Sequence, residues 1–252
     1  EGYIQEGLLA HLKDRTDQLV SLTAGSTRSF AYDRYGNQTI EALSAADQRT
    51  MAYDTGLRLI GLVTAAGTSA TFTPDALGRQ RTRLVGGTTE TYGYLGLAET
   101  VWSVDDGGSG TWRSGFDVTG GTRLATTKAS VLAYLVPDLL GSLVAIEGTG
   151  STAISHAWRY DGYGQRLAAS SGAPDLDVGF FGALDRSPDA TPLYDIGARY
   201  YSPASGAWSQ LDTVAGSAQD PRTMNRFLYA HGNPATLVEP SGHSVRSMTD
   251  GG

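Results

Sequence analysis

One short string in this sequence offers catalytic chemistry at first sight. Residues 54–56 read Asp-Thr-Gly, the pattern of the catalytic loop in pepsin-like proteases. Asp54 also belongs to a series of evenly spaced aspartates, so we interpret it as a turn residue rather than a catalytic acid. The histidines are scattered without the spacing of metal ligands, so we predict no metal site and no cofactor. These histidines are His11, His156, His231 and His243.

Other motifs that carry chemistry are weak or missing. The string "DDGGSG" at 105–110 could be a calcium-binding loop, but its glycines favour a flexible hairpin tip. The sequence contains no Walker motif, no dinucleotide-binding fingerprint and no Gly-x-Ser-x-Gly elbow. It also has no cysteine, which excludes disulfides, thiolate metal sites and cysteine nucleophiles.

The elements that must position any site are organised as a repeat. One position, held by aspartate in all copies but one, recurs every 21 residues, with a longer last step of 23 residues. We call this position the slot; an aromatic residue, proline or leucine precedes it. Three residues after the slot, a glycine follows in most copies; in the copy at Asp54 it comes one position early, as Gly56. The slot is filled by Asp33, Asp54, Asp75, Gly96, Asp117, Asp138 and Asp161. The glycines are Gly36, Gly78, Gly120, Gly141 and Gly164.

The physics of one repeat predicts a β-hairpin. An aspartate can accept a hydrogen bond from the backbone two residues later, and a glycine after it can take the positive φ that closes a turn. Twenty-one residues correspond to about two strands of six to eight residues and two turns. Fixed-period repetition of this kind is typical of a stacked or rolled-up sheet, so we predict an all-β, antiparallel fold.

Composition excludes several classes of protein. Of the 252 residues, 40% are hydrophobic and 18% charged, which is typical of a globular chain. The net charge of −7 would repel a phosphate backbone, so we do not expect nucleic-acid binding. No apolar stretch approaches the roughly 18 residues of a membrane span. The N-terminus lacks a signal-peptide pattern and an initial Met, so we expect a fragment or processed product.

The last third carries a denser motif, "GARYYSPASGAWSQLD" followed by "NRFLYAHGNP" and "VEPSG". Together with the tandem repeats it resembles the Rhs/YD-repeat family and its C-terminal core motif. That family includes bacterial polymorphic toxins, the C subunits of insecticidal toxin complexes and the teneurin shells. The residues that fall on the motif are Tyr200, Tyr201, Pro203, Gly206, Trp208, Asp212, Asn225, Tyr229, Asn233, Pro234, Pro240 and Gly242.

The resemblance implies an antiparallel YD-repeat sheet coiled into a shell or barrel with a C-terminal plug. It implies a YD-repeat array over 1–178, a core or plug over 179–242 and a tail over 243–252. Bacterial members enclose a C-terminal effector domain, so the implied partners are such an effector or further upstream repeats. The implied location is outside the cell, on its surface, or in a target reached by a bacterial secretion system. Whether these repeats form a small closed barrel, join further chain or associate through sheet edges stays open.

The resemblance also implies a candidate site. In many members the core cuts the chain just downstream through two carboxylates, whose positions correspond to Asp212 and Glu239. This sequence departs from the motif twice, with "LDTVAG" at the first position and a glutamate at the second. Arg199 falls on the family's arginine, and we expect it to be a buried charge partner that supports the pair. Self-cleavage and a purely structural plug both remain open.

A rival function of a different class is a structural or adhesive protein of the cell surface. Such a protein would bind carbohydrate or a partner protein through the outer face of the sheet and would cleave nothing. Residue 239 separates the two readings, because an aspartate there would favour cleavage.

Overall fold

A computed structural model describes residues 10–13, 18–24, 26–44, 47–108, 110–116, 122–128, 131–148, 153–170, 178–189 and 191–248. One antiparallel sheet contains sixteen strands in sequence order, β1 to β16. The strands are β1 (Ala10–Lys13), β2 (Leu19–Ala24), β3 (Ser26–Tyr32), β4 (Gln38–Ser44), β5 (Asp47–Tyr53), β6 (Leu59–Val63), β7 (Ser69–Pro74), β8 (Gln80–Val85), β9 (Thr88–Tyr94), β10 (Val101–Asp105), β11 (Thr111–Phe116), β12 (Arg123–Lys128), β13 (Val131–Pro137), β14 (Leu143–Gly148), β15 (Ile154–Tyr160) and β16 (Arg166–Ala169).

The C-terminal segment forms smaller elements. A four-stranded sheet joins β17 (Leu184–Asp185), β18 (Tyr194–Ile196), β19 (Arg199–Ser202) and β20 (Ala207–Trp208). A two-stranded sheet joins β21 (Leu237–Val238) to β22 (Arg246–Ser247). Three short 3₁₀ turns complete it: η1 (Phe180–Gly182), η2 (Pro221–Thr223) and η3 (Tyr229–Gly232). No helix in the described part of the chain is long and apolar enough to cross a membrane.

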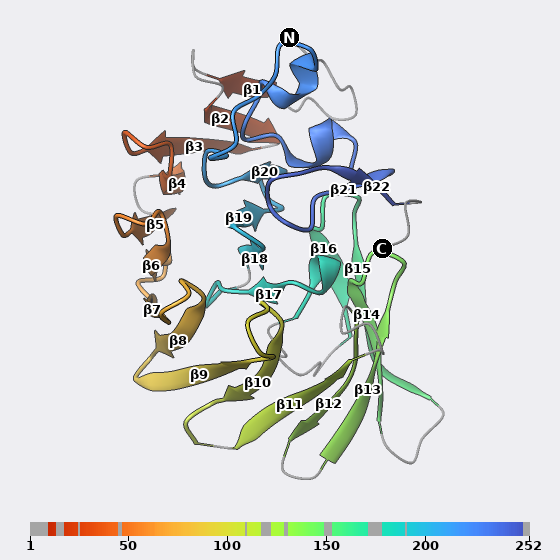
Figure 1. Cartoon of the computed structure of the whole chain (residues 1–252). Helices are drawn as coiled ribbons and strands as arrows, with labels where there is room; N and C mark the ends of the chain where they lie inside the picture. Colours follow the sequence, from red (N-terminus) through yellow and green to blue (C-terminus); the bar gives the residue numbers. More distant parts are fainter. Residues whose placement is uncertain are drawn as a thin grey trace.

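The large sheet curls around the C-terminal segment (Figure 1). Its strands run down one side of the molecule, across the bottom and up the other side, and β17–β20 lie between the two arms. No pairing among the described residues joins β1 to β16, so the sheet is curled but open rather than a closed barrel. This arrangement confirms the all-β antiparallel prediction, with the C-terminal segment held inside the curve.

The predicted turns are confirmed in the five described copies of the repeat that contain the aspartate. In each, the Asp carboxylate accepts a hydrogen bond from the backbone N–H two residues later, and a second one from the N–H four residues later. The glycine three residues after the Asp has a φ between 82° and 87° in four copies, at Gly36, Gly78, Gly141 and Gly164. Asp117 and Gly120 lie outside the described residues.

Two copies depart from the pattern. In the copy at Asp54 the glycine comes one position early, so Leu57 occupies the left-handed position with φ 62°. In the copy predicted at Gly96, the turn begins at Leu95 instead, and its closing bond to the carbonyl of Thr100 spans one residue more. Leucine has no side-chain acceptor, so this wider turn lacks the carboxylate that organises the others.

A recurring irregularity accompanies the curl. In eight hairpins the register shifts between the last two residues of the incoming strand, and one residue of the outgoing strand is skipped. Thr39, Ile60 and Arg81 are three of the residues skipped. A β-bulge bends its strand and increases the local twist. A bulge at the same place in successive repeats therefore bends the sheet the same way each time.

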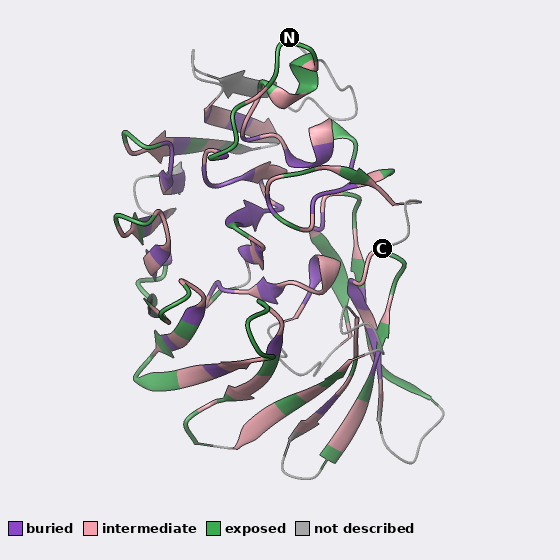
Figure 2. Ribbon diagram, in the orientation of Figure 1, coloured by how far each residue is buried: buried purple, intermediate pink, exposed green. Residues whose placement is uncertain are grey.

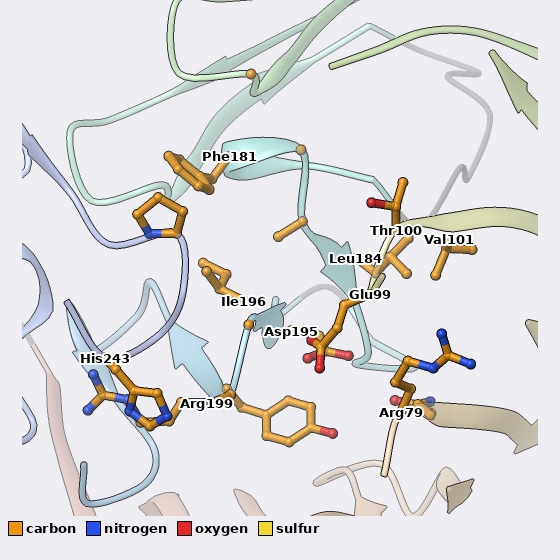
Figure 3. Close-up of a pocket in the computed structure, with 18 of the residues that line it drawn as sticks. Arg79, Glu99, Thr100, Val101, Phe181, Leu184, Asp195, Ile196, Arg199 and His243 are labelled. Atoms are coloured by element: carbon orange, nitrogen blue, oxygen red, sulfur yellow. The ribbon is translucent and has the colours of Figure 1, made fainter. Parts of the chain in front are cut away.

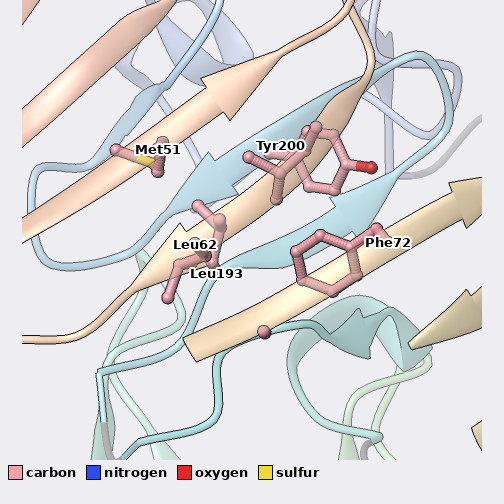
Figure 4. Close-up of a cluster of buried hydrophobic side chains, with 7 residues drawn as sticks. Met51, Leu62, Phe72, Leu193 and Tyr200 are labelled. Carbon is pink, nitrogen blue, oxygen red and sulfur yellow. The ribbon is translucent and has the colours of Figure 1, made fainter. Parts of the chain in front are cut away.

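The core lies between the curled sheet and the C-terminal segment, where the buried residues gather (Figure 2). One cluster joins Met51, Leu62 and Phe72 of the sheet to Leu193 and Tyr200 of the C-terminal segment (Figure 4). A second cluster is aromatic, with Phe180, Tyr194, Tyr201, Trp208 and Tyr229 packed together.

Hydrogen bonds tie the two layers together at several levels. The backbone N–H of Gln38 donates to the carbonyl of Ser209 at 2.7 Å, and Arg83 donates to the carbonyl of Ser187 at 3.0 Å. The sheet thus holds the C-terminal segment through backbone groups as well as through apolar packing.

Candidate functional site

The candidate carboxylates are brought together by one arginine. The Nη2 atom of Arg199, the first residue of β19, lies 2.6 Å from Oε1 of Glu239 and 3.0 Å from Oδ2 of Asp212. All three residues are buried. Asp212 follows β20 in the chain and Glu239 follows β21, so three separate parts of the C-terminal segment converge on this point.

Each nitrogen of the Arg199 guanidinium donates a hydrogen bond. Its Nη1 donates to the carbonyl of Arg226 at 2.9 Å, and its Nε donates to the carbonyl of Gly242. The guanidinium carbon lies 4.2 Å from the centre of the Trp208 ring, within cation–π range. Burial lowers the pKa of Arg199, while the two carboxylates oppose that shift.

Glu239 accepts hydrogen bonds at both carboxylate oxygens. Besides the bond from Arg199, its Oε2 accepts from the backbone N–H of Ala230 at 3.0 Å and from Nε1 of Trp208 at 3.3 Å. Ala230 and His231 both have positive φ, 47° and 51°, which is costly for residues other than glycine. Burial raises the pKa of the Glu239 carboxyl, while the Ala230 N–H and Arg199 oppose the increase.

Asp212 connects the cluster to the chain that follows the core. Its Oδ1 accepts from the backbone N–H of Val214 at 2.8 Å and lies 2.7 Å from Nδ1 of His243. His243 was considered in the sequence only as a metal ligand, and its 31-residue separation from Asp212 gave no signal of this contact. The carbonyl of Asp212 also accepts a bond from Arg226.

The chain at 241–243 passes close to the cluster. Gly242 has φ 70°, and a Cβ there would lie 2.7 Å from the carbonyl oxygen of Ile196. Gly197 packs against the same segment, because a Cβ on it would lie 2.3 Å from the carbonyl oxygen of Ser241. Both positions therefore require glycine, and the close approach sets the Gly242 carbonyl against Arg199.

A cavity of about 1070 Å³ adjoins the cluster (Figure 3). Arg199 and His243 line one part of it, and Arg79, Glu99 and Asp195 line another. Its walls come from the turns of the sheet and from the C-terminal segment, so the cavity lies between the two layers.

The other sequence candidates do not join this site. Asp54 forms its predicted turn, with bonds from the N–H groups of Gly56 and Arg58. The segment 105–110 connects β10 to β11, as predicted for a hairpin tip. The ring of His156 contacts Ser155 on β15. The side chain of His11 lies outside the described part.

Comparison with known proteins finds nucleases and a toxin subunit among the relatives, although no family model matches the chain. The chain is 26% identical over 234 residues, 92% of its length, to the tRNA3(Ser)-specific nuclease WapA of Bacillus spizizenii. It is 33% identical over 112 residues, 44% of its length, to the toxin subunit YenC1 of Yersinia entomophaga. The chain spans about a tenth of the length of these relatives (10% and 11%).

Among solved structures, the fold is similar to a chain in the crystal structure of TcdB2-TccC3-TEV. The TM-score is 0.60 and the sequence identity 16%, over 93% of this chain and 15% of that one. The similarity supports the all-β architecture of a long curled sheet.

Proposed function

We propose that this chain belongs to the Rhs/YD-repeat family and forms part of the wall of a toxin shell. In this proposal residues 1–178 form the wall, residues 179–242 plug it and residues 243–252 form a tail. The observation that carries the proposal is the curled sheet of sixteen strands around its own C-terminal segment. The similarity to WapA and YenC1 supports the link to toxins.

The enclosed partner would be an effector polypeptide, carried by a protein that is secreted or delivered to its target. The open sheet supports the idea of a wall that continues beyond this chain. The edges at β1 and β16 pair with no further strand among the described residues, and exposed edges invite aggregation. Further repeats of a longer protein would cover these edges.

Protease protection tests the shell. The native full-length protein is digested with a nonspecific protease, before and after unfolding in urea, and the surviving peptides are identified by mass. A shell predicts that a polypeptide segment outside the repeats survives digestion in the folded protein and is lost after unfolding. Equal digestion of that segment under both conditions would contradict enclosure.

The Arg199 cluster favours a second activity, self-cleavage just after the core. Buried carboxyls held this close can share acid and base roles, because burial favours the protonated form of one of them. In this reading Glu239 is the acid, since burial raises its pKa, and Asp212 activates water. The water oxygen bonds to a backbone carbonyl carbon, the C–N bond breaks, and the amine leaves with the proton from Glu239.

Arg199 would support that reaction by positioning the chain. Its Nε hydrogen bond to the Gly242 carbonyl holds the segment after the core beside both carboxylates. Intact mass after prolonged incubation tests the activity: the wild type should lose a C-terminal piece cut after Gly242, and Asp212→Asn should stay whole. Asp220→Asn, which changes a partly exposed aspartate of the same segment, is the matched control and should be cut like the wild type. A wild type that stays whole would leave the cluster as a structural lock.

A further inference from the structure

The carboxylate of Asp212 is largely occupied by hydrogen bonds. Its Oδ1 accepts from the backbone N–H of Val214 at 2.8 Å and contacts Nδ1 of His243 at 2.7 Å. Its Oδ2 pairs with Nη2 of Arg199 at 3.0 Å. A carboxylate oxygen accepts about two hydrogen bonds, so Oδ1 is saturated and Oδ2 is held by a cation. Asp212 is therefore better placed to orient a neighbouring side chain than to take a proton from water itself.

His243 is the side chain that Asp212 orients. It is 31% exposed, against 10% for Asp212, and its ring lies beside Arg199 on one wall of the cavity (Figure 3). Nδ1 contacts Asp212, whereas no residue in the described part of the chain forms a hydrogen bond with Nε2. An ionised carboxylate only accepts hydrogen bonds, so Nδ1 carries the hydrogen of this contact. A neutral ring then presents the lone pair of Nε2.

The peptide bond between Gly242 and His243 is held on both sides. The Gly242 carbonyl accepts from Nε of Arg199, and the Gly242 N–H donates to the carbonyl of Glu239 at 3.1 Å. The N–H of His243 donates to Oγ of Ser241 at 3.2 Å. A cation that donates to a carbonyl oxygen stabilises the negative charge that forms there when water attacks. These contacts favour this bond as the one that is cut.

From this geometry we infer that His243 is the base of the proposed self-cleavage and that Asp212 is its positioning residue. The inference rests on the proposed function, since it assigns a role in that same reaction. A carboxylate that holds the Nδ1–H of a histidine fixes the ring and leaves Nε2 as the base, as in serine proteases. Histidine is suited to this role at neutral pH, because it ordinarily changes its charge between about pH 5 and 8.

The reaction consumes one water molecule. Nε2 of His243 takes a proton from the water, whose oxygen bonds to the carbonyl carbon of Gly242. The C–N bond to His243 breaks, and the amine leaves with the proton of Glu239. Arg199 stabilises the negative charge that the carbonyl oxygen carries during the attack. The proton on His243 then returns to Glu239 through solvent, so that atoms and charge balance.

Cleavage during synthesis tests the role of His243. The full-length protein is made in a cell-free system, and intact mass in timed samples gives the rate at which the chain is cut after Gly242. His243→Gln keeps an amide that can donate to Asp212 but cannot take a proton from water. Its rate should fall by at least about 100-fold, the usual contribution of a general base. The matched control is His156→Gln, which changes a histidine of β15 away from the cavity and should be cut at the wild-type rate.

Rescue by imidazole separates a base from a structural contact. His243→Ala removes a ring that is partly exposed at the cavity wall, so a small molecule can enter the space that it leaves. Added imidazole should raise the cleavage rate of this variant by at least about tenfold, in proportion to its concentration, because it replaces the missing base. It should leave Asp212→Asn unchanged, since that variant retains its own imidazole.

The outcomes distinguish this inference from the proposed function. A wild type that is never cut would overturn both. A wild type that is cut, together with His243→Gln cut at the same rate, would overturn the role of His243 and leave self-cleavage standing. Slow cleavage of His243→Gln without imidazole rescue of His243→Ala would also overturn it, because His243 would then be only a structural contact of Asp212.

Discussion

Replacing Arg199 with methionine removes the charge that holds the C-terminal segment together. Methionine keeps an unbranched apolar stem that can still pack on Trp208, so the change mainly deletes the guanidinium. The side chain of Arg199 is 4% exposed, and those of Glu239 and Asp212 are 3% and 10% exposed. The substitution therefore leaves two buried carboxylates without their cation.

The expected loss in the free energy of unfolding depends on the hydrogen bonds that each carboxylate retains. Breaking a buried ion pair by removing one partner costs about 3–5 kcal/mol. Glu239 retains the N–H of Ala230 and Nε1 of Trp208, and Asp212 retains the N–H of Val214 and the contact with His243. Because these bonds remain, we expect a loss near the lower end of this range, at about 3 kcal/mol.

Urea unfolding at pH 7 measures this loss against a matched control. Arg222→Met removes the arginine of the Arg222–Asp220 pair, whose side chains are 66% and 35% exposed. An exposed pair contributes about 0–1 kcal/mol, so this control should change the free energy of unfolding little. A loss below about 1 kcal/mol for Arg199→Met, or equal losses for both variants, would show that the buried charge of Arg199 does not stabilise the C-terminal segment.

The pH dependence of Arg199→Met gives an independent check. Burial already raises the pKa of Glu239, and loss of Arg199 removes an opposing charge, so this pKa should rise further. A carboxyl whose pKa is higher in the folded state causes no penalty below its unfolded pKa, and the penalty grows as pH rises through the folded pKa. The difference between the wild type and the variant should therefore shrink as the pH is lowered toward about 4.

Three further predictions concern the repeat and can all be checked by equilibrium unfolding. Leu57→Gly should stabilise the protein by about 0.5–1 kcal/mol, because Leu57 has φ 62° and glycine tolerates that conformation; a destabilised variant would contradict this. Gly36→Ala should cost roughly 2–4 kcal/mol, since φ is 83° and the new Cβ would lie 2.7 Å from Cβ of Leu211. Partial burial opposes the shift, but bonds from Arg79 and the backbone hold the pKa of Asp75 below its ordinary value. Asp75 therefore stabilises the fold above about pH 4 and loses this effect as pH falls further, so Asp75→Asn should flatten the stability profile in that range.

The fold could be predicted from the sequence because the repeat has a local physical cause. Each Asp caps its own turn through bonds to residues two and four positions later, so spacing alone located the turns at Asp33, Asp54, Asp75, Asp138 and Asp161. The bulge beside each turn was not predicted, because one skipped residue in the register leaves no mark on the aspartate spacing. The repeat allowed either a stacked or a rolled-up sheet, and the family resemblance indicated the coiled form.

The site was less predictable, because its contacts join distant positions. The resemblance indicated Asp212, Glu239 and Arg199, but it did not indicate that one guanidinium nitrogen contacts both carboxylates. The contact of His243 with Asp212 depends on the path of the chain after Gly242. Arg123 and Arg186 lie 63 residues apart in the numbering and line the same cavity because the sheet curls around the C-terminal segment.

We propose above all that the curled sheet is part of a wall around an enclosed polypeptide. Electron cryo-microscopy of the native full-length protein tests it most directly. A shell wall requires that strands continue the sheet beyond the β1 edge and that polypeptide density fills the enclosed space. A sheet that ends at β1 and β16 with nothing inside it would show that the chain is not part of a shell wall.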